Sequence, residues 1–155
     1  MKIVLNTSPL IFLSKLGYLN ALKQIFSEVH IPNAVLKELT ARRDETYDDV
    51  SKLINESFII VDEVETIEVL KANLHAGEAE AIILAKKLSC WVVLDDSKAR
   101  KTAEKEGLNV IGTAGLLKVM SKMGLIRENP EELFEKLSAI KFRMKKEQFL
   151  EIFRD

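Results

Sequence analysis

The stretch Trp91-Val92-Val93-Leu94-Asp95-Asp96-Ser97-Lys98-Ala99-Arg100 decides how the chain folds. Its first four residues form a continuous β-prone run, which is typical of a strand buried on both faces. The polar residues 95–97 that follow predict the cap of a helix, and Gly107 marks its end. A buried strand that leads through a polar cluster into a helix is the unit from which α/β folds are built.

The beginning of the chain repeats this order. Residues 3–5 (Ile-Val-Leu) predict a short buried strand, and residues 6–8 (Asn-Thr-Ser) form the next polar cluster. Ser8 as N-cap and Pro9 at the first helical position predict a helix, which Gly17 ends in the left-handed conformation. The same sequence of strand, polar residues and helix therefore occurs at least twice.

Further elements complete an alternating pattern. Besides the two strands above, strands are expected over residues 29–31, 58–61 and 108–111. Helices are expected over residues 19–26, 32–41, 47–57, 66–74, 78–88 and from Gly112 onward, with two more near the carboxyl terminus. Alternation of strands and helices predicts a three-layer α/β/α sandwich around a central, mainly parallel five-stranded sheet.

Length and composition narrow the class of protein. With 155 residues, 47% of them hydrophobic, the chain predicts a single domain over residues 1–155, whose C-terminal helices (130–155) pack either on the domain or on a partner. The formal net charge of −1 excludes a global basic field that would hold nucleic acid. A single cysteine, Cys90, excludes an internal disulfide and Cys-rich zinc clusters. We see no signal peptide and no membrane-spanning segment, so we expect a cytoplasmic protein.

Candidate site residues follow the strands, because ligands of open α/β sheets bind beyond the carboxyl ends of the strands. Asn6, Thr7 and Ser8 follow the first strand, and Asp95 and Asp96 follow the fourth. Adjacent carboxylates repel each other, and a divalent cation relieves that repulsion. The alternative is structural: Asp96 or Ser97 could simply cap the next helix.

Two further acids lie beside apolar neighbours on predicted helices. Glu78 shares a helix face with Ala81, Ile82 and Ala85, and we favour it over the competing Glu80. Glu38 lies one turn after Ala34 and Val35, which is a weak signal by itself. An acid in the first turn of a helix can also serve only the helix dipole.

Other chemistries have less support. The two histidines, His30 and His75, have no spacing typical of a zinc site or a catalytic triad. Glycine-rich dinucleotide and P-loop motifs are absent from the sequence. Gly112 to Gly115 could accept a phosphate at a helix start, although close backbone packing explains these glycines equally well.

Basic residues accompany the acids. Lys98, Arg100 and Lys101 follow Asp96 directly, and a second group lies near the carboxyl terminus: Lys141, Arg143, Lys145 and Lys146. Central acids with cations around them suit a phosphodiester held over metal. A solvated helix face is the alternative for both groups, above all for the second.

Five stretches in this order resemble the PIN-domain family, the fold of VapC-type toxin ribonucleases, and in particular a branch of prokaryotic PIN-like proteins. They are residues 4–11, 31–39, 77–82, 94–100 and 112–117, so the resemblance covers most of the chain. It implies a Mg²⁺- or Mn²⁺-dependent ribonuclease whose acids meet in a central pocket. By resemblance the four positions are Asn6, Glu38, Glu78 and Asp96, with Asp95 as an added metal ligand. Thr7, Ser8 and Ser97 would support the site, and Lys98 or Arg100 would contact phosphate.

The resemblance also implies partners: RNA as substrate, a small antitoxin protein that blocks the pocket, and a second copy in a homodimer. Asn6 departs from the family pattern, which has an acid there. Its amide oxygen can still ligate a hard cation but carries no charge, so metal should be held more weakly. A catalytically silent PIN-like module that binds RNA or protein is therefore the second hypothesis, and a phosphate- or nucleotide-binding α/β domain the third.

Overall fold

The core of the molecule is a five-stranded sheet in which every neighbouring pair of strands is parallel. The computed structural model describes residues 1–65 and 73–154. The strand order is β3-β2-β1-β4-β5, which confirms the predicted sheet. The strands are β1 (Lys2–Leu5), β2 (Glu28–Pro32), β3 (Ile59–Asp62), β4 (Trp91–Val93) and β5 (Val110–Ile111).

Strand β1 lies at the centre because both of its faces are apolar. Ile3 pairs with Val29 of β2 on one side and with Trp91 of β4 on the other. The side chains of Ile3 and Leu5 join the larger hydrophobic core, whereas Val4 joins the smaller one. Alternate residues of one strand therefore fill two cores on opposite faces of the sheet.

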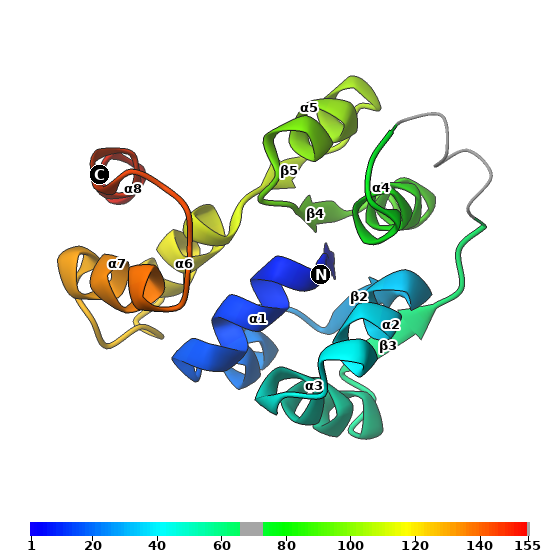
Figure 1. Cartoon of the computed structure of the whole chain (residues 1–155), viewed down its shortest axis with the longest axis horizontal. Helices are drawn as coiled ribbons and strands as arrows, with labels where there is room; N and C mark the ends of the chain where they lie inside the picture. The colour runs from blue at the N-terminus through cyan, green and yellow to red at the C-terminus, as the bar shows by residue number, and fades with distance from the viewer. Residues whose placement is uncertain (66–72, 155) are drawn as a thin grey trace.

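Helices cover both faces and make three layers (Figure 1). α4 (Ala76–Leu88) and α5 (Ser97–Lys105) supply the smaller core, packed around Val4, Val92 and Leu94. The other face carries the larger core with the remaining helices. These are α1 (Thr7–Leu16), the 3₁₀ helix η1 (Leu19–Gln24), α2 (Asn33–Arg42), α3 (Glu45–Asn55), α6 (Thr113–Lys122), α7 (Pro130–Ala139) and α8 (Lys146–Phe153).

Some local predictions were wrong. Helix α1 starts at Thr7 with Asn6 as its N-cap residue, so Ser8 is not the cap and Pro9 is the third helical residue. Gly17 does end this helix, with φ of 83°, as predicted. The segment expected as a short helix over 19–26 is a 3₁₀ helix. Most of the helix expected over 66–74 lies outside the described residues.

The C-terminal helices pack on the rest of this chain. Phe149 of α8 is fully buried, and its ring lies 5.4 Å from that of Phe134 and 6.2 Å from that of Phe142. Phe142 in turn meets Phe12 of α1 edge-on at 5.1 Å. A continuous aromatic cluster therefore joins α7 and α8 to the first helix of the fold.

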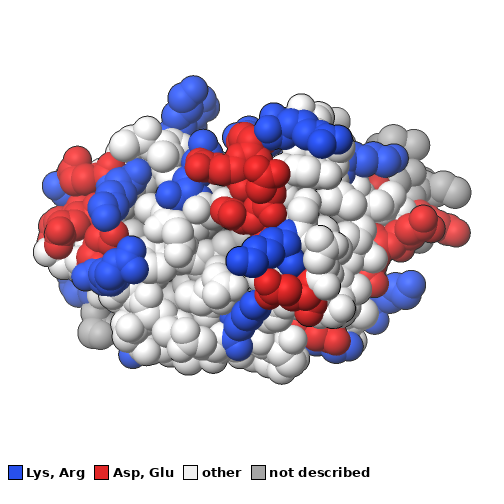
Figure 2. Space-filling view, turned by 90° about the horizontal axis from the view of Figure 1, so that it is seen from below, with Lys and Arg blue, Asp and Glu red and all other residues white. Residues whose placement is uncertain are grey.

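Charge is distributed in small patches. On the face seen from below, acidic and basic side chains lie next to one another and no field of one sign covers it (Figure 2). Among the described residues, no helix is both long and apolar enough to cross a membrane.

Phe149→Ala should test the aromatic cluster. Removing a fully buried ring leaves a cavity, and we expect the free energy of unfolding to fall by about 3 kcal/mol or more. Denaturant unfolding of this variant should be compared with that of Gln148→Ala, whose side chain is exposed and whose loss should cost less than about 0.5 kcal/mol. Equal stability of the two variants would contradict the packing described here.

Candidate active site

A groove of about 870 Å³ opens at the carboxyl ends of β1 and β4. The chain reaches it from the starts of α1, α4 and α5, from the end of α2 and from the connection between α7 and α8. Its polar walls are formed by Asn6, Thr7, Ser8, Glu38, Arg42, His75, Glu78, Asp95, Asp96, Ser97, Lys141 and Arg143. The parallel sheet therefore brings together all four positions that were expected to carry an acid or its replacement.

Asn6 faces the groove and not its own helix. An asparagine at an N-cap usually accepts a hydrogen bond from the first turn, but the Asn6 side chain forms no such bond. It is 7% exposed, and its Oδ1 lies beside the backbone of Gly77 at the start of α4. A Cβ atom at Gly77 would be 3.2 Å from this oxygen and 2.5 Å from Oε1 of Glu38. Glycine thus allows the start of α4 to approach two site oxygens closely.

Glu38 is held by the residue after Asn6. The hydroxyl of Thr7 donates a hydrogen bond to Glu38 Oε2 at 2.7 Å, while Oε1 faces Gly77. Thr7 is buried, whereas the Glu38 side chain is exposed to the groove. This contact places one carboxylate oxygen and leaves the other free for a ligand.

Glu78 lies in the first turn of α4, and its pKa is raised above the ordinary carboxylate value. Burial is the main cause, and repulsion from the Asp96 and Glu38 carboxylates adds to it. The backbone N–H of His75 donates to Glu78 Oε1 at 3.3 Å and opposes this shift. Glu78 also shares a smaller pocket of about 240 Å³ with Asp96 and Lys98. Burial and the neighbouring carboxylates thus both disfavour the charged form of Glu78.

The adjacent Asp95 and Asp96 have different surroundings. Asp95 Oδ1 accepts the Thr113 backbone N–H at 2.7 Å, and its Oδ2 accepts the hydroxyls of Ser8 and Thr113, both at 2.6 Å. Asp96 is the N-cap of α5, where its Oδ2 accepts the Ala99 N–H at 2.9 Å. Both oxygens of Asp95 are therefore engaged in fixing α1 and α6, whereas Asp96 keeps one oxygen free beside Glu78.

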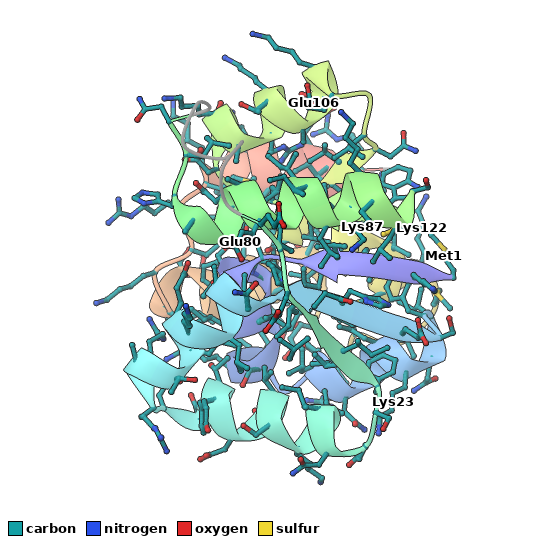
Figure 3. All side chains as sticks on the ribbon, turned by 90° about the vertical axis from the view of Figure 1, so that its right-hand side faces the viewer. Met1, Lys23, Glu80, Lys87, Glu106 and Lys122 are labelled. Atoms are coloured by element: carbon teal, nitrogen blue, oxygen red, sulfur yellow. The ribbon has the colours of Figure 1, made fainter. Side chains whose placement is uncertain are left out.

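Glu80, the competitor of Glu78, has a structural surrounding. It is 2% exposed, and its Oε1 accepts the Ala34 N–H at 3.1 Å, at the start of α2. Figure 3 shows it on the side of α4 that faces α2. A carboxylate at a helix N-terminus stabilises that helix, which accounts for a buried acid outside the groove.

The expected phosphate-binding cations lie beside the groove, and three others, Arg42, Lys141 and Arg143, line it. Lys98 Nζ donates to the carbonyl of Asn73 at 3.2 Å, and Arg100 Nη1 packs against Gly112 at the start of α6. Lys141 and Arg143 line the groove itself. The sequence left open whether these two accompany the acids or lie on a solvated helix face, because the packing of Phe142 on Phe12 that brings them here is a long-range contact.

The donor atoms of the groove suit a hard divalent cation. Carboxylate and amide oxygens are ligands that Mg²⁺ and Mn²⁺ accept. The groove is lined by four carboxylates, those of Glu38, Glu78, Asp95 and Asp96, and by the amide of Asn6. Across residues 1–65 and 73–154, however, no three His, Cys, Asp or Glu side chains form a ready-made metal cluster. The fourth position, Asn6, contributes an amide oxygen, and asparagine is not among these four residue types. The chemistry fits, and the roles of these residues as metal ligands stay predictions.

Alanine at Asp95 and at Asp96 should separate the two roles. Asp95→Ala leaves the Thr113 N–H and two hydroxyls without their acceptor, so the free energy of unfolding should fall by about 3 kcal/mol. Asp96→Ala removes a helix cap and should cost about 1 kcal/mol. Denaturant unfolding of both variants in a chelator measures the difference, and a larger loss for Asp96→Ala would contradict this assignment.

Glu78→Gln should reveal the repulsion in the groove. A raised pKa means that the folded chain binds the Glu78 proton more tightly than the unfolded chain. Stability is therefore lost as pH rises from the ordinary value of 4.5 through the raised one. Glutamine keeps the acceptor for the His75 N–H but cannot ionise. In a chelator, the free energy of unfolding of the variant should therefore rise relative to that of wild type as the pH approaches neutrality. The rise should be no more than about 1 kcal/mol because Glu78 is partly exposed. Thermal unfolding from about pH 4 to about pH 8, with the exposed Glu104→Gln as control, tests this; no gain over the control would contradict it.

Comparison with known proteins identifies the family of the chain and a solved structure with a similar fold. A family model described as PIN domain matches residues 2–155. Among solved structures, the fold is similar to a PilT N-terminus domain protein from the hyperthermophilic archaeon Sulfolobus solfataricus P2. The TM-score is 0.50 and the identity 18%, over 94% of this chain and 98% of that one. No protein of curated function matches the sequence. The match over nearly the whole chain, together with a five-stranded parallel sheet between helical layers, shows that the protein belongs to the PIN domain family.

Proposed function

We propose that this protein is a metal-dependent ribonuclease that hydrolyses phosphodiester bonds with Mg²⁺ or Mn²⁺. One observation carries the proposal: Glu38, Glu78 and Asp96 come from three separate helices and line one groove, together with Asn6. No ion pair of these three acids is found among the described residues, so no side-chain cation there balances their charges. Burial first, and then repulsion from Asp96 and Glu38, raises the pKa of Glu78, and a bound cation would relieve both.

Each residue has a definite task in this proposal. Glu38, Glu78 and Asp96 would hold the metal, and Asn6 would offer a neutral oxygen as the fourth donor. Thr7 orients Glu38 through its hydrogen bond. A bound ion would supply Lewis-acid chemistry and a lowered pKa for a ligated water. Asp95 was expected to be an additional ligand; because Ser8 and Thr113 occupy both its oxygens, we assign it to positioning.

Asn6 favours a second candidate function. With amide in place of carboxylate, the groove carries one negative charge less and would bind a divalent ion more weakly. A PIN-domain module that binds RNA or protein without cleaving it would keep the same fold and groove. The two candidates differ in whether Asn6 suffices for metal-dependent cleavage.

Further parts of the proposal rest on the resemblance to VapC-type toxins alone. They are a toxin role, a small antitoxin protein that blocks the groove, a homodimer and a cytoplasmic location. The groove as described opens to solvent, which suits a macromolecular substrate or inhibitor.

The deciding experiment measures cleavage of a labelled single-stranded RNA pool with Mn²⁺, for wild type, Asn6→Asp and Glu78→Gln. For the ribonuclease, wild type should cleave, a chelator should abolish cleavage, and Glu78→Gln should lower the rate about a hundredfold or more because a ligand is lost. Glu104→Gln, which removes an exposed charge, should leave the rate unchanged.

The other outcomes separate the candidates. Cleavage by Asn6→Asp alone would identify an intact groove that is disarmed in the natural sequence, and would favour the binding module. Cleavage by neither protein would refute the ribonuclease. Full activity of Glu78→Gln would show that the groove is assigned to the wrong residues.

A further inference from the structure

The groove that holds the acids also has basic residues in its wall. Lys141, Phe142 and Arg143, from the connection between α7 and α8, line the same cavity as Glu38, Glu78 and Asp96. We name residues 141–143 the basic clasp. The clasp and the acids lie far apart in the sequence, so only the tertiary fold brings them together.

The clasp is held rigidly by its central residue. Phe142 is 8% exposed and packs between Phe12 and Phe149. Its backbone N–H donates to the Leu137 carbonyl at 3.0 Å, and the Lys141 N–H donates to Ser138 at 3.1 Å. These two bonds, with Lys141 at a φ of 70°, form the capped end of α7. The two cations on either side of the buried ring are therefore fixed in place at their backbone, and both side chains are exposed.

The cations of the clasp are unpaired. Within the part of the chain that the structure describes, neither Lys141 nor Arg143 forms an ion pair, although four carboxylates share their groove. The third cation of the groove, Arg42, is occupied by Asp44 at 2.9 Å. Acids and cations that face one cavity without closing on each other leave room for a ligand that satisfies both.

Part of the groove lining is apolar. Ile11, Phe12 and Ala41 line the groove together with Phe142, and we name these four residues the apolar floor. An unpaired nucleobase can pack against an aromatic side chain, whereas the bases of a duplex are already stacked and inaccessible. A floor of this kind beside cations fits a single strand better than a helix.

We infer that the basic clasp binds the backbone of single-stranded RNA, with Lys141 and Arg143 on phosphates next to the acids and a base against Phe12. The inference rests on the proposed ribonuclease function and names the residues that hold its substrate. The acids would repel phosphates and protein carboxylates alike, so RNA is favoured over an acidic protein segment because only RNA has bases that fill the apolar floor.

The test is binding of a fluorescent single-stranded RNA of about 12 nucleotides in a chelator, where no metal-dependent cleavage occurs. Anisotropy gives Kd over a series of salt concentrations. Lys141→Gln/Arg143→Gln should weaken binding about tenfold or more at low salt. It should also reduce the slope of log K against log salt by about 1.4, because two phosphate contacts are lost. The control Lys87→Gln/Lys105→Gln removes the same charge from exposed positions on α4 and α5 outside the groove and should leave the slope unchanged.

Several results would overturn the inference. If the Lys141→Gln/Arg143→Gln variant had the Kd and salt slope of wild type, these two residues would not belong to the binding surface. RNA cleavage by that variant would then leave the ribonuclease proposal standing. Equal affinity of wild type for the single strand and for the matching RNA duplex would contradict the packing of a base against Phe12. Binding of polyglutamate that depends on the clasp, with no RNA binding, would identify an acidic protein segment as the occupant. Absence of both RNA binding and cleavage in wild type would refute both proposals together.

Discussion

The position of β1 between β2 and β4 is the constraint on which the rest of the structure depends. All pairs in the sheet are parallel, so every strand ends at the same edge and each return to the opposite edge requires a crossover. The residues just after each strand are consequently gathered at one place. Figure 3 views the sheet from the side, with Met1 marking the edge where β1 begins, opposite the edge where the groove opens. The fold thus collects polar residues there whatever their chemistry, and the sequence decides what they do.

Collecting carboxylates at one edge has an electrostatic cost, and the local structure offsets part of it. Helices α1, α4 and α5 begin at the groove and direct the positive ends of their dipoles toward it. Thr7 donates to Glu38, and the Ala99 N–H donates to Asp96. The pKa of Glu78 is nevertheless raised, by burial first and by repulsion from Asp96 and Glu38 in addition. Asn6 carries no charge, so it adds nothing to the repulsion among the carboxylates of the groove.

Much of the fold could be predicted from the sequence because its signals are local. The runs around Val4 and Val92 are apolar on both faces, which indicates buried strands. Gly17 ends helix α1 because glycine adopts the left-handed conformation at a helix end without strain. The role of Ser8 could not be predicted in this way. A serine before a proline has the pattern of an N-cap, but its hydroxyl donates to Asp95, which is distant in the sequence. Glu80 and Lys141 are similar cases, since a buried acid and a groove cation are distinguished from surface charges only by tertiary contacts.

The pair Asp95 and Asp96 shows how adjacent identical residues acquire separate tasks. A strand end directs successive side chains to different sides, so one carboxylate turns toward Thr113 and Ser8 and the other toward the start of α5 and Glu78. The first fixes α1 and α6 against the sheet, and α1 carries Phe12, against which Phe142 of the basic clasp packs. The acids and the basic clasp are therefore linked through one chain of contacts, from Asp95 through Ser8 and α1 to Phe142. The last helices of the chain are in this sense part of the groove wall, because their packing determines where its cations lie.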